Sequence, residues 1–187
     1  MNKVKTMNIA LIGYGFVGKT FHAPLIQSVD GLKLAVISSR DEEKVKRDLP
    51  DVLVVATPEE AIQHPDIDLV VIASPNATHA PLATLALNAG KHVVVDKPFT
   101  LDMQEARDLI ALAEEKQLLL SVFHNRRWDS DFLGIKQVIA QGSIGKVKHF
   151  ESHIDRFRPE VRVRWREQNV PGSGLWFDLG PHMIDQT

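Results

Sequence analysis

Three polar side chains have the types and spacing of groups that move protons and stabilise charge. Lys97 lies just after an apolar run, and Asp178 precedes His182 by four residues. An imidazole can take up and return a hydroxyl proton while hydride leaves the adjacent carbon. An ammonium group can stabilise negative charge developing on oxygen, and a carboxylate can hold the tautomer of a neighbouring imidazole. Together these residues predict chemistry at a secondary alcohol.

The spacing of Asp178 and His182 favours one shared helical face, with Asp185 three residues further on. Pro181 could instead mark the first turn of that helix, which would leave Asp178 in the preceding turn. Taken singly, each residue also has a structural explanation. A Lys-Pro pair after a strand is usually a turn, and a lone histidine on an amphipathic helix usually packs in the core.

A glycine-rich turn precedes all three and predicts a phosphate site. It is the G-x-G-x-x-G run Gly13-Tyr14-Gly15-Phe16-Val17-Gly18. The run follows the first expected strand and opens the first helix, which is the context of a dinucleotide site. Gly15 would let the backbone approach a pyrophosphate, and amides at the helix N-terminus would face it. The alternative is a tight turn that binds nothing.

The end of the second expected strand favours NADP over NAD. An NAD site usually has Asp or Glu there to bind the ribose hydroxyls. This strand ends in Ser38-Ser39-Arg40, and no carboxylate follows before Asp41. Two hydroxyls and a guanidinium can receive a 2′-phosphate. Otherwise Arg40 is only a solvated residue before a helix that begins near Asp41.

Further cofactor-binding candidates follow later strands, at the edge where an open α/β sheet binds its ligands. They are Ser74, Pro75, Asn76 and His79 after the fourth strand, Asp96 and Lys97 after the fifth, and Asn125 after the sixth. Asn76 could equally cap a helix that runs to Asn88 and ends at Gly90. Asn125 could meet the nicotinamide amide or simply end its strand.

The elements that must position these residues alternate in the βαβ manner of a doubly wound parallel sheet, an α/β fold. The expected strands are Asn8–Ile12, Leu32–Ile37, Val52–Val55, Leu69–Ala73, His92–Val95 and Leu118–Phe123. Pro24 should kink or restart the first helix. Asp102 should cap another helix, because Glu105 follows at capping-box spacing. A Rossmann domain is therefore predicted over residues 1–124.

Residues 125–187 have a different pattern, which predicts the start of an α+β open-sheet substrate domain. We expect a helix over Asp131–Gln141, a turn at Ile144–Lys146 and a strand over Lys146–Phe157. Sixty residues with one strand and one helix bury too little to form a complete domain. The chain is therefore expected to bind cofactor yet show weak or no turnover by itself.

Composition excludes several other functions. The 187 residues carry 22 basic and 24 acidic side chains and no cysteine. This nearly even balance of charge gives no reason to expect nucleic-acid binding. No segment is long and apolar enough to cross a membrane, so we expect a cytoplasmic protein. The basic stretch Arg156, Arg158, Arg162, Arg164 and Arg166 is better explained by a solvated loop or a domain contact. His149, Glu151 and His153 alternate along the expected strand, but nothing else indicates a metal site.

Five motifs in this order resemble the glucose–fructose oxidoreductase/inositol dehydrogenase/rhizopine-catabolism (Gfo/Idh/MocA) family over essentially the whole chain. They are the glycine run, Ser-Pro-Asn-x-x-His, Ala-Gly-Lys-His-Val, Asp-Lys-Pro and Asp-x-Gly-x-His-x-x-Asp. The Ser-Ser-Arg ending and the segment 124–129 are most similar to NADP-dependent scyllo-inositol dehydrogenase-type bacterial members.

The resemblance implies that Lys97 is the catalytic lysine, His182 the acid/base histidine and Asp178 its accompanying aspartate. Asp96 departs from the family's usual glutamate, which puts in doubt any contact of the longer side chain. The implied activity is NADP-dependent hydride transfer to or from a polyol, cyclitol or sugar, in a protein that forms homo-oligomers at full length. The alternative is a non-catalytic NADP-sensing regulator of the same fold, although a sensor needs no such catalytic set.

Overall fold

The computed structural model describes residues 6–160 and 163–187. The chain forms two compact units, which divide between Val122 and Phe123. No helix within the described residues is long and apolar enough to cross a membrane.

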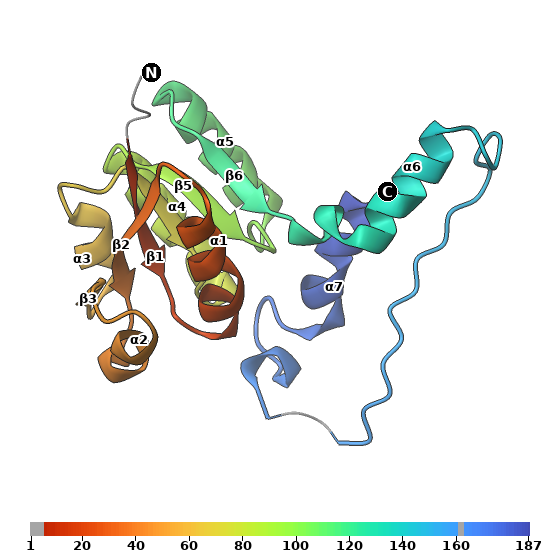
Figure 1. Ribbon diagram of the computed structural model, residues 1–187. Coiled ribbons are helices and arrows are strands. Elements are labelled where there is room, and N and C mark those ends of the chain that lie inside the picture. The colour runs from red at the N-terminus through yellow and green to blue at the C-terminus, as the bar shows by residue number, and fades with distance from the viewer. Residues whose placement is uncertain (1–5, 161–162) are drawn as a thin grey trace. The chain divides into compact units, whose positions relative to one another are not determined.

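The first unit is built on a six-stranded sheet of order β3-β2-β1-β4-β5-β6 (Figure 1). The strands are β1 Met7–Ile12, β2 Leu32–Ser38, β3 Leu53–Val55, β4 Leu69–Ile72, β5 His92–Asp96 and β6 Leu120–Phe123. All six predicted strands are therefore present, with ends that differ by at most two residues. The order is that of the doubly wound dinucleotide-binding fold, in which β1 lies next to both β2 and β4.

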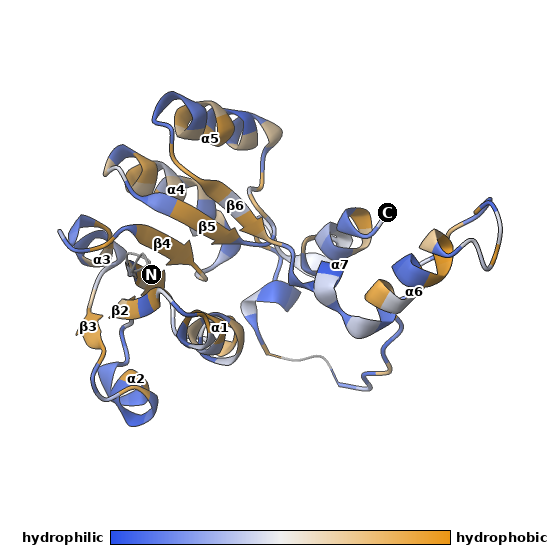
Figure 2. Ribbon diagram, turned by 45° about the horizontal axis from the view of Figure 1, so that its top comes forward, coloured by the Kyte–Doolittle hydropathy of each residue, from blue (hydrophilic) through white to orange (hydrophobic). Residues whose placement is uncertain are grey.

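Helices cover both faces of this sheet because its strands are apolar on both sides. The helices are α1 Ala23–Ser28, α2 Glu42–Asp48, α3 Pro58–Gln63, α4 His79–Asn88 and α5 Met103–Glu115. Ala10 and Ile12 pack with α3, α4 and α5, whereas Ile9 and Leu11 pack with α1 and α2. Successive residues of a strand point to opposite faces, which gives the unit two cores. Figure 2 shows the central strands as predominantly hydrophobic.

Local signals explain where these helices begin and end. Asp102 caps α5 by accepting hydrogen bonds from the amides of Gln104 and Glu105, as predicted. Gly90 ends α4 with a φ of 74°, a left-handed conformation that suits glycine. A single π-helical turn, Gly18–His22, runs directly into α1, so the break predicted near Pro24 is a change of helix type.

The regular secondary structure described in the second unit consists of helices and 3-10 turns. It contains α6 Ser130–Ala140, α7 Gly174–Asp185 and the short 3-10 turns Asn125–Trp128 and Trp165–Glu167. The predicted strand over Lys146–Phe157 is wrong, because this segment is irregular and exposed for most of its length. A strand needs a partner for its backbone groups, and the described part of this unit contains no other strand.

Candidate functional site

The carboxyl ends of β1, β2, β4 and β5 lie along one edge of the first unit's sheet, because the four strands are parallel. The glycine-rich turn follows β1, and the Ser-Ser-Arg segment follows β2. The Ser74–Asn76 and Asp96–Lys97 segments follow β4 and β5. Nearly all cofactor-binding candidates are thus gathered at one edge, where open α/β sheets bind ligands.

The glycine turn has two glycines required by packing and one that faces open space. Gly13 has a φ of 95°, and an added Cβ would lie 2.7 Å from the Ala73 carbonyl oxygen. A Cβ on Gly18 would lie 2.1 Å from the oxygen of Gly13. At Gly15 an added Cβ meets nothing within 4 Å. Gly13 therefore lets the turn pass close to the end of β4, Gly18 lets the following helix pack against the turn, and the backbone at Gly15 is open to a ligand.

Tyr14 points its side chain away from the turn and into the protein. Its hydroxyl donates a hydrogen bond to Asp48 at 3.2 Å. Burial, together with the Asp48 carboxylate, raises the pKa of Tyr14 to about 12, so the phenol keeps its proton. The hydrogen bond from Lys19 in turn lowers the pKa of Asp48. Tyr14 therefore anchors the turn to α2 and offers a ligand only its backbone.

Lys44 is a candidate that the sequence reasoning did not identify. It lies in the first turn of α2, and its Nζ donates to the carbonyl oxygen of Tyr14 at 3.0 Å. This contact brings an ammonium group from α2 to the glycine turn. Its spacing of four residues from Arg40 was visible in the sequence, but the contact with Tyr14 depends on the fold.

The segment at the end of β2 leaves one cationic side chain exposed, while the Ser39 hydroxyl binds the backbone of Asp41. Ser38 is buried, and its carbonyl accepts from the Gly13 amide at 3.0 Å. Arg40 is exposed. Asp41 turns its carboxylate onto the start of α2, accepting from the Lys44 amide at 2.9 Å. The first carboxylate after the strand is thereby committed to capping a helix.

The loop after β4 forms a compact 3-10 turn, Asn76–Thr78. The hydroxyls of Ser74 and Thr78 lie 2.6 Å apart, and the Thr78 hydroxyl donates to the Pro75 carbonyl at 2.7 Å. Asn76 is buried but is not the helix cap, because α4 starts at His79 after Thr78. The capping alternative for Asn76 is therefore wrong.

Asp96 and Lys97 are both buried at the end of β5. The Asp96 carboxylate accepts from the amide of Lys97 at 2.9 Å. The shorter carboxylate, present where the family usually has glutamate, thus fixes the backbone from which the Lys97 side chain extends.

Asp178 and His182 lie one turn apart on α7, which runs through Pro181 without a break. The alternative in which Pro181 begins the helix is therefore wrong, and the two side chains share a helical face as predicted. His182 is buried. Both residues belong to the second unit, whereas Lys97 belongs to the first.

The end of α7 is fixed to the turn that contains Asn125. Arg127 Nε donates to Asp185 at 3.0 Å, and a second guanidinium nitrogen binds the other carboxylate oxygen. His124 lies 3.4 Å from the same carboxylate. Gln186 donates to the carbonyl of Arg126 at 2.9 Å. Asn125 and His182 are thus held in one unit by contacts between residues about 60 apart in the sequence.

We expect Asp185→Asn to loosen this attachment and to remove its pH dependence. The hydrogen bond from Arg127 lowers the pKa of Asp185 below its ordinary value of 3.8. The ion pair therefore stabilises the second unit fully above that value and is lost as pH falls through the lowered pKa. Because Arg127 is half exposed and solvent screens the pair, the loss of stability should be small.

Hydrogen exchange of the α7 amides, measured against pH, checks this expectation. Asp155→Asn, in the irregular segment, is the control and should leave α7 protection unchanged. Unchanged protection in Asp185→Asn at neutral pH would contradict the assignment.

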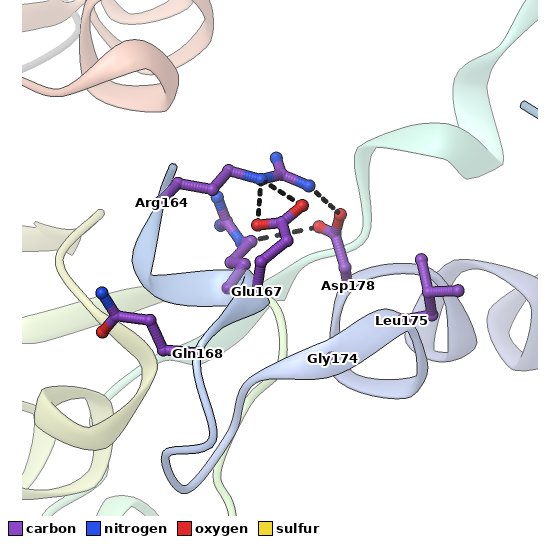
Figure 3. A pocket seen from close by; sticks show the side chains of 7 residues that line it. Arg164, Glu167, Gln168, Gly174, Leu175 and Asp178 are labelled. Carbon is purple, nitrogen blue, oxygen red and sulfur yellow. Dashed lines mark hydrogen bonds and ion pairs between the residues drawn. The ribbon is translucent and has the colours of Figure 1, made fainter. Parts of the chain in front are cut away.

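Asp178 faces two arginines of the basic stretch. It lies 3.9 Å from Arg164 and 3.6 Å from Arg166, and Arg164 also binds Glu167 (Figure 3). These side chains line a hollow of about 230 Å³ together with Gln168, Gly174 and Leu175. The two arginines therefore make ion pairs with acidic side chains of their own unit.

The remaining candidates form no further site. His149 and His153 both contact Glu151, and all three are exposed. The described residues contain no group of three side chains arranged to hold a metal ion. Arg162 lies outside the described residues.

Comparison with known proteins agrees with this architecture. Residues 7–124 match the oxidoreductase family with an NAD-binding Rossmann fold (GFO_IDH_MocA). Residues 136–187 match the C-terminal alpha/beta domain of the same oxidoreductase family.

Relatives and solved structures show similarity along nearly the entire chain. The uncharacterized oxidoreductase YdgJ of Escherichia coli is 61% identical over 97% of this chain and 52% of its own length. The scyllo-inositol 2-dehydrogenase (NADP(+)) IolW of Bacillus subtilis is 43% identical over 99% of this chain and 52% of its own length. A crystal structure from Klebsiella pneumoniae is 84% identical with a TM-score of 0.89, covering 97% of this chain and 51% of that one. The chain spans about half the length of the curated relatives it matches, and it belongs to the GFO/IDH/MocA oxidoreductase family.

Proposed function

We propose that the protein is an NADP-dependent oxidoreductase that transfers hydride between nicotinamide and a secondary hydroxyl of a polyol, cyclitol or sugar. One observation carries the proposal. The glycine turn, the Ser-Ser-Arg segment and Lys97 follow strands whose carboxyl ends share one sheet edge. A dinucleotide laid along that edge has its pyrophosphate at the glycine turn after β1, between the other two segments.

The adenosine end of the site supports NADP. A 2′-phosphate beyond β2 would meet the exposed Arg40 guanidinium, whereas the Ser39 hydroxyl is bound to the backbone of Asp41 and would have to exchange that contact for the phosphate. Lys44 adds a second cation, because its ammonium group already reaches the glycine turn. Asp41, the nearest carboxylate after the strand, caps α2. The relative IolW carries NADP(+) in its name, which agrees with this assignment.

The reacting end of the site supports hydride transfer. Bound nicotinamide would supply or accept the hydride. Lys97 extends from the edge of the sheet that binds the cofactor, and its ammonium group would stabilise negative charge on the substrate oxygen. His182 would move the hydroxyl proton, and Asp178, one turn away, would favour its cationic form.

Candidate substrates are ring polyols with adjacent secondary hydroxyls. Two relatives are named as dehydrogenases of scyllo-inositol and of myo-inositol. A screen of cyclitols and sugars with NADP, followed by the absorbance of the reduced nicotinamide, tests this range. Tight NADPH binding without turnover on any of them would favour the sensor alternative.

Arg40→Ala is expected to weaken NADPH binding by about 10- to 100-fold and to leave NADH binding unchanged. A charged hydrogen bond to a phosphate contributes about 1.5–3 kcal/mol, and 1.4 kcal/mol corresponds to a tenfold change in Kd. Lys44→Ala should act in the same direction. The measurement is a titration of each variant with both cofactors, followed by nicotinamide fluorescence.

Lys33→Ala provides the matched control. Lys33 is an exposed cation near the opposite end of β2, so its removal changes net charge without touching the site. It should bind NADPH like the parent chain. Equal affinity of the parent chain for NADPH and NADH would overturn the assignment of the 2′-phosphate site.

A further inference from the structure

His79 is a buried histidine whose two ring nitrogens both contact backbone carbonyls of the sheet edge. It is 1% exposed and is the first residue of α4. Nδ1 lies 2.7 Å from the carbonyl oxygen of Pro98, and Nε2 lies 3.0 Å from that of Ser74. One imidazole therefore spans the loop after β4 and the loop after β5.

These two loops contain the cofactor and catalytic candidates of the first unit. Ser74 lies two residues before the 3-10 turn that starts at Asn76, and Pro98 directly follows Lys97. Each loop is also fixed internally, by the Ser74–Thr78 hydroxyl pair and by the Asp96 carboxylate on the Lys97 amide. His79 adds a contact from one loop to the other.

The chemistry of the two contacts distinguishes the ring nitrogens. A carbonyl oxygen only accepts hydrogen bonds, so each contact is a hydrogen bond only if its nitrogen bears hydrogen. The Nε2 contact stays within the β4 loop, five residues away, whereas the Nδ1 contact reaches 19 residues along the chain. The shorter contact is the one that links the loops.

We propose that His79 is a positioning residue for Lys97, acting through a hydrogen bond from Nδ1–H to the Pro98 carbonyl. With 1% of its surface exposed, its ring is shielded from a ligand and acts on the backbone instead. This role differs from the direct cofactor contact first expected for His79. The proposal rests on the proposed function, because it assumes that the position of Lys97 determines turnover.

Asparagine and glutamine separate the two contacts experimentally. The amide nitrogen of asparagine can take the place of Nδ1, and that of glutamine the place of Nε2. In the complete protein, His79→Gln is expected to lower kcat by about 10²-fold with little change in KM, since small misplacements of a catalytic group cost about that much. His79→Asn should restore kcat to within about threefold of the parent value.

His92→Gln is the matched control, at the opposite end of β5. His92 also fixes a backbone group, because its Nδ1 accepts from the Leu119 amide at 3.0 Å. Its replacement should lower thermal stability as much as His79→Gln does, yet leave kcat unchanged. A purely structural role for His79 would make the two variants alike in kcat, and this would overturn the proposal.

Hydrogen exchange provides a readout that does not depend on turnover. The Lys97 amide should exchange faster in His79→Gln than in His79→Asn or His92→Gln. If the parent protein turned over none of the cyclitols and sugars while this exchange pattern appeared, the proposed function would fail and the loop link would stand. If Lys97→Met lost activity while His79→Gln kept it, the positioning role would fail alone.

Discussion

Lys97→Met in the complete protein is expected to lower kcat by about 10²- to 10³-fold, the usual effect of removing one group that stabilises developing charge. Methionine has a similar length and no charge, so packing at this buried position is largely kept. Cofactor affinity should change little, because the proposed adenosine and pyrophosphate contacts follow β2 and β1. Steady-state kinetics together with an NADPH titration check both statements.

The matched control is Lys91→Met, at the opposite end of β5. Lys91 Nζ donates to the carbonyls of Ile67 and His64 at 2.7 and 3.3 Å, so it fixes backbone in the same unit. Its loss should lower thermal stability and leave kcat intact. A Lys97→Met protein that binds NADPH and turns over at the parent rate would remove Lys97 from the mechanism.

His182→Asn is expected to lower kcat by about 10²- to 10⁴-fold, the range for loss of a general acid or base. Asparagine keeps hydrogen bonding but cannot take up the hydroxyl proton. The bell-shaped or sigmoid pH dependence of kcat/KM should lose the limb that reports the imidazole. This pH profile separates a proton-transfer role from a loss of folding.

Asp178→Asn should act in the same direction with a smaller effect, because it would remove the charge that we propose favours the imidazolium. The control is His149→Asn, an exposed histidine of the same unit. It should keep both rate and pH profile. An unchanged pH profile in His182→Asn would assign the proton transfer to another group.

The sheet was predictable because its signals are local. Continuous apolar runs mark strands that are covered on both faces, and all six were found with ends that differ by at most two residues. Asp102 begins α5 and Gly90 ends α4 through contacts within a few residues, so their roles were readable from sequence. By contrast, the short helix α3 was not predicted, although Thr57 and Glu60 form a capping box.

The second unit was less predictable because strands depend on partners. The Lys146–Phe157 segment has the alternation of a strand, yet the described residues of its unit offer no neighbouring strand. Pro181 lies in a segment of the same unit that does form a regular element. It is an ambiguous local signal, and the structure resolves it by continuing α7 through the proline.

The contacts that define the candidate site were the hardest to predict. Lys44 reaches Tyr14 across 30 residues, and His79 reaches Pro98 across 19. Residue types and motif order identified which segments matter. Only the fold shows that Tyr14 contributes backbone alone and that His79 contacts two loops.

Transfer of deuterium from substrate to cofactor tests the central claim most directly. The complete protein would be incubated with NADP and scyllo-inositol deuterated at its ring carbons, and the nicotinamide product examined by NMR and mass spectrometry. The account predicts deuterium at C4 of NADPH, formed faster than the corresponding NADH, and its loss in Lys97→Met and His182→Asn. NADPH that binds but gains no deuterium from scyllo-inositol or from any similarly labelled cyclitol or sugar would contradict it.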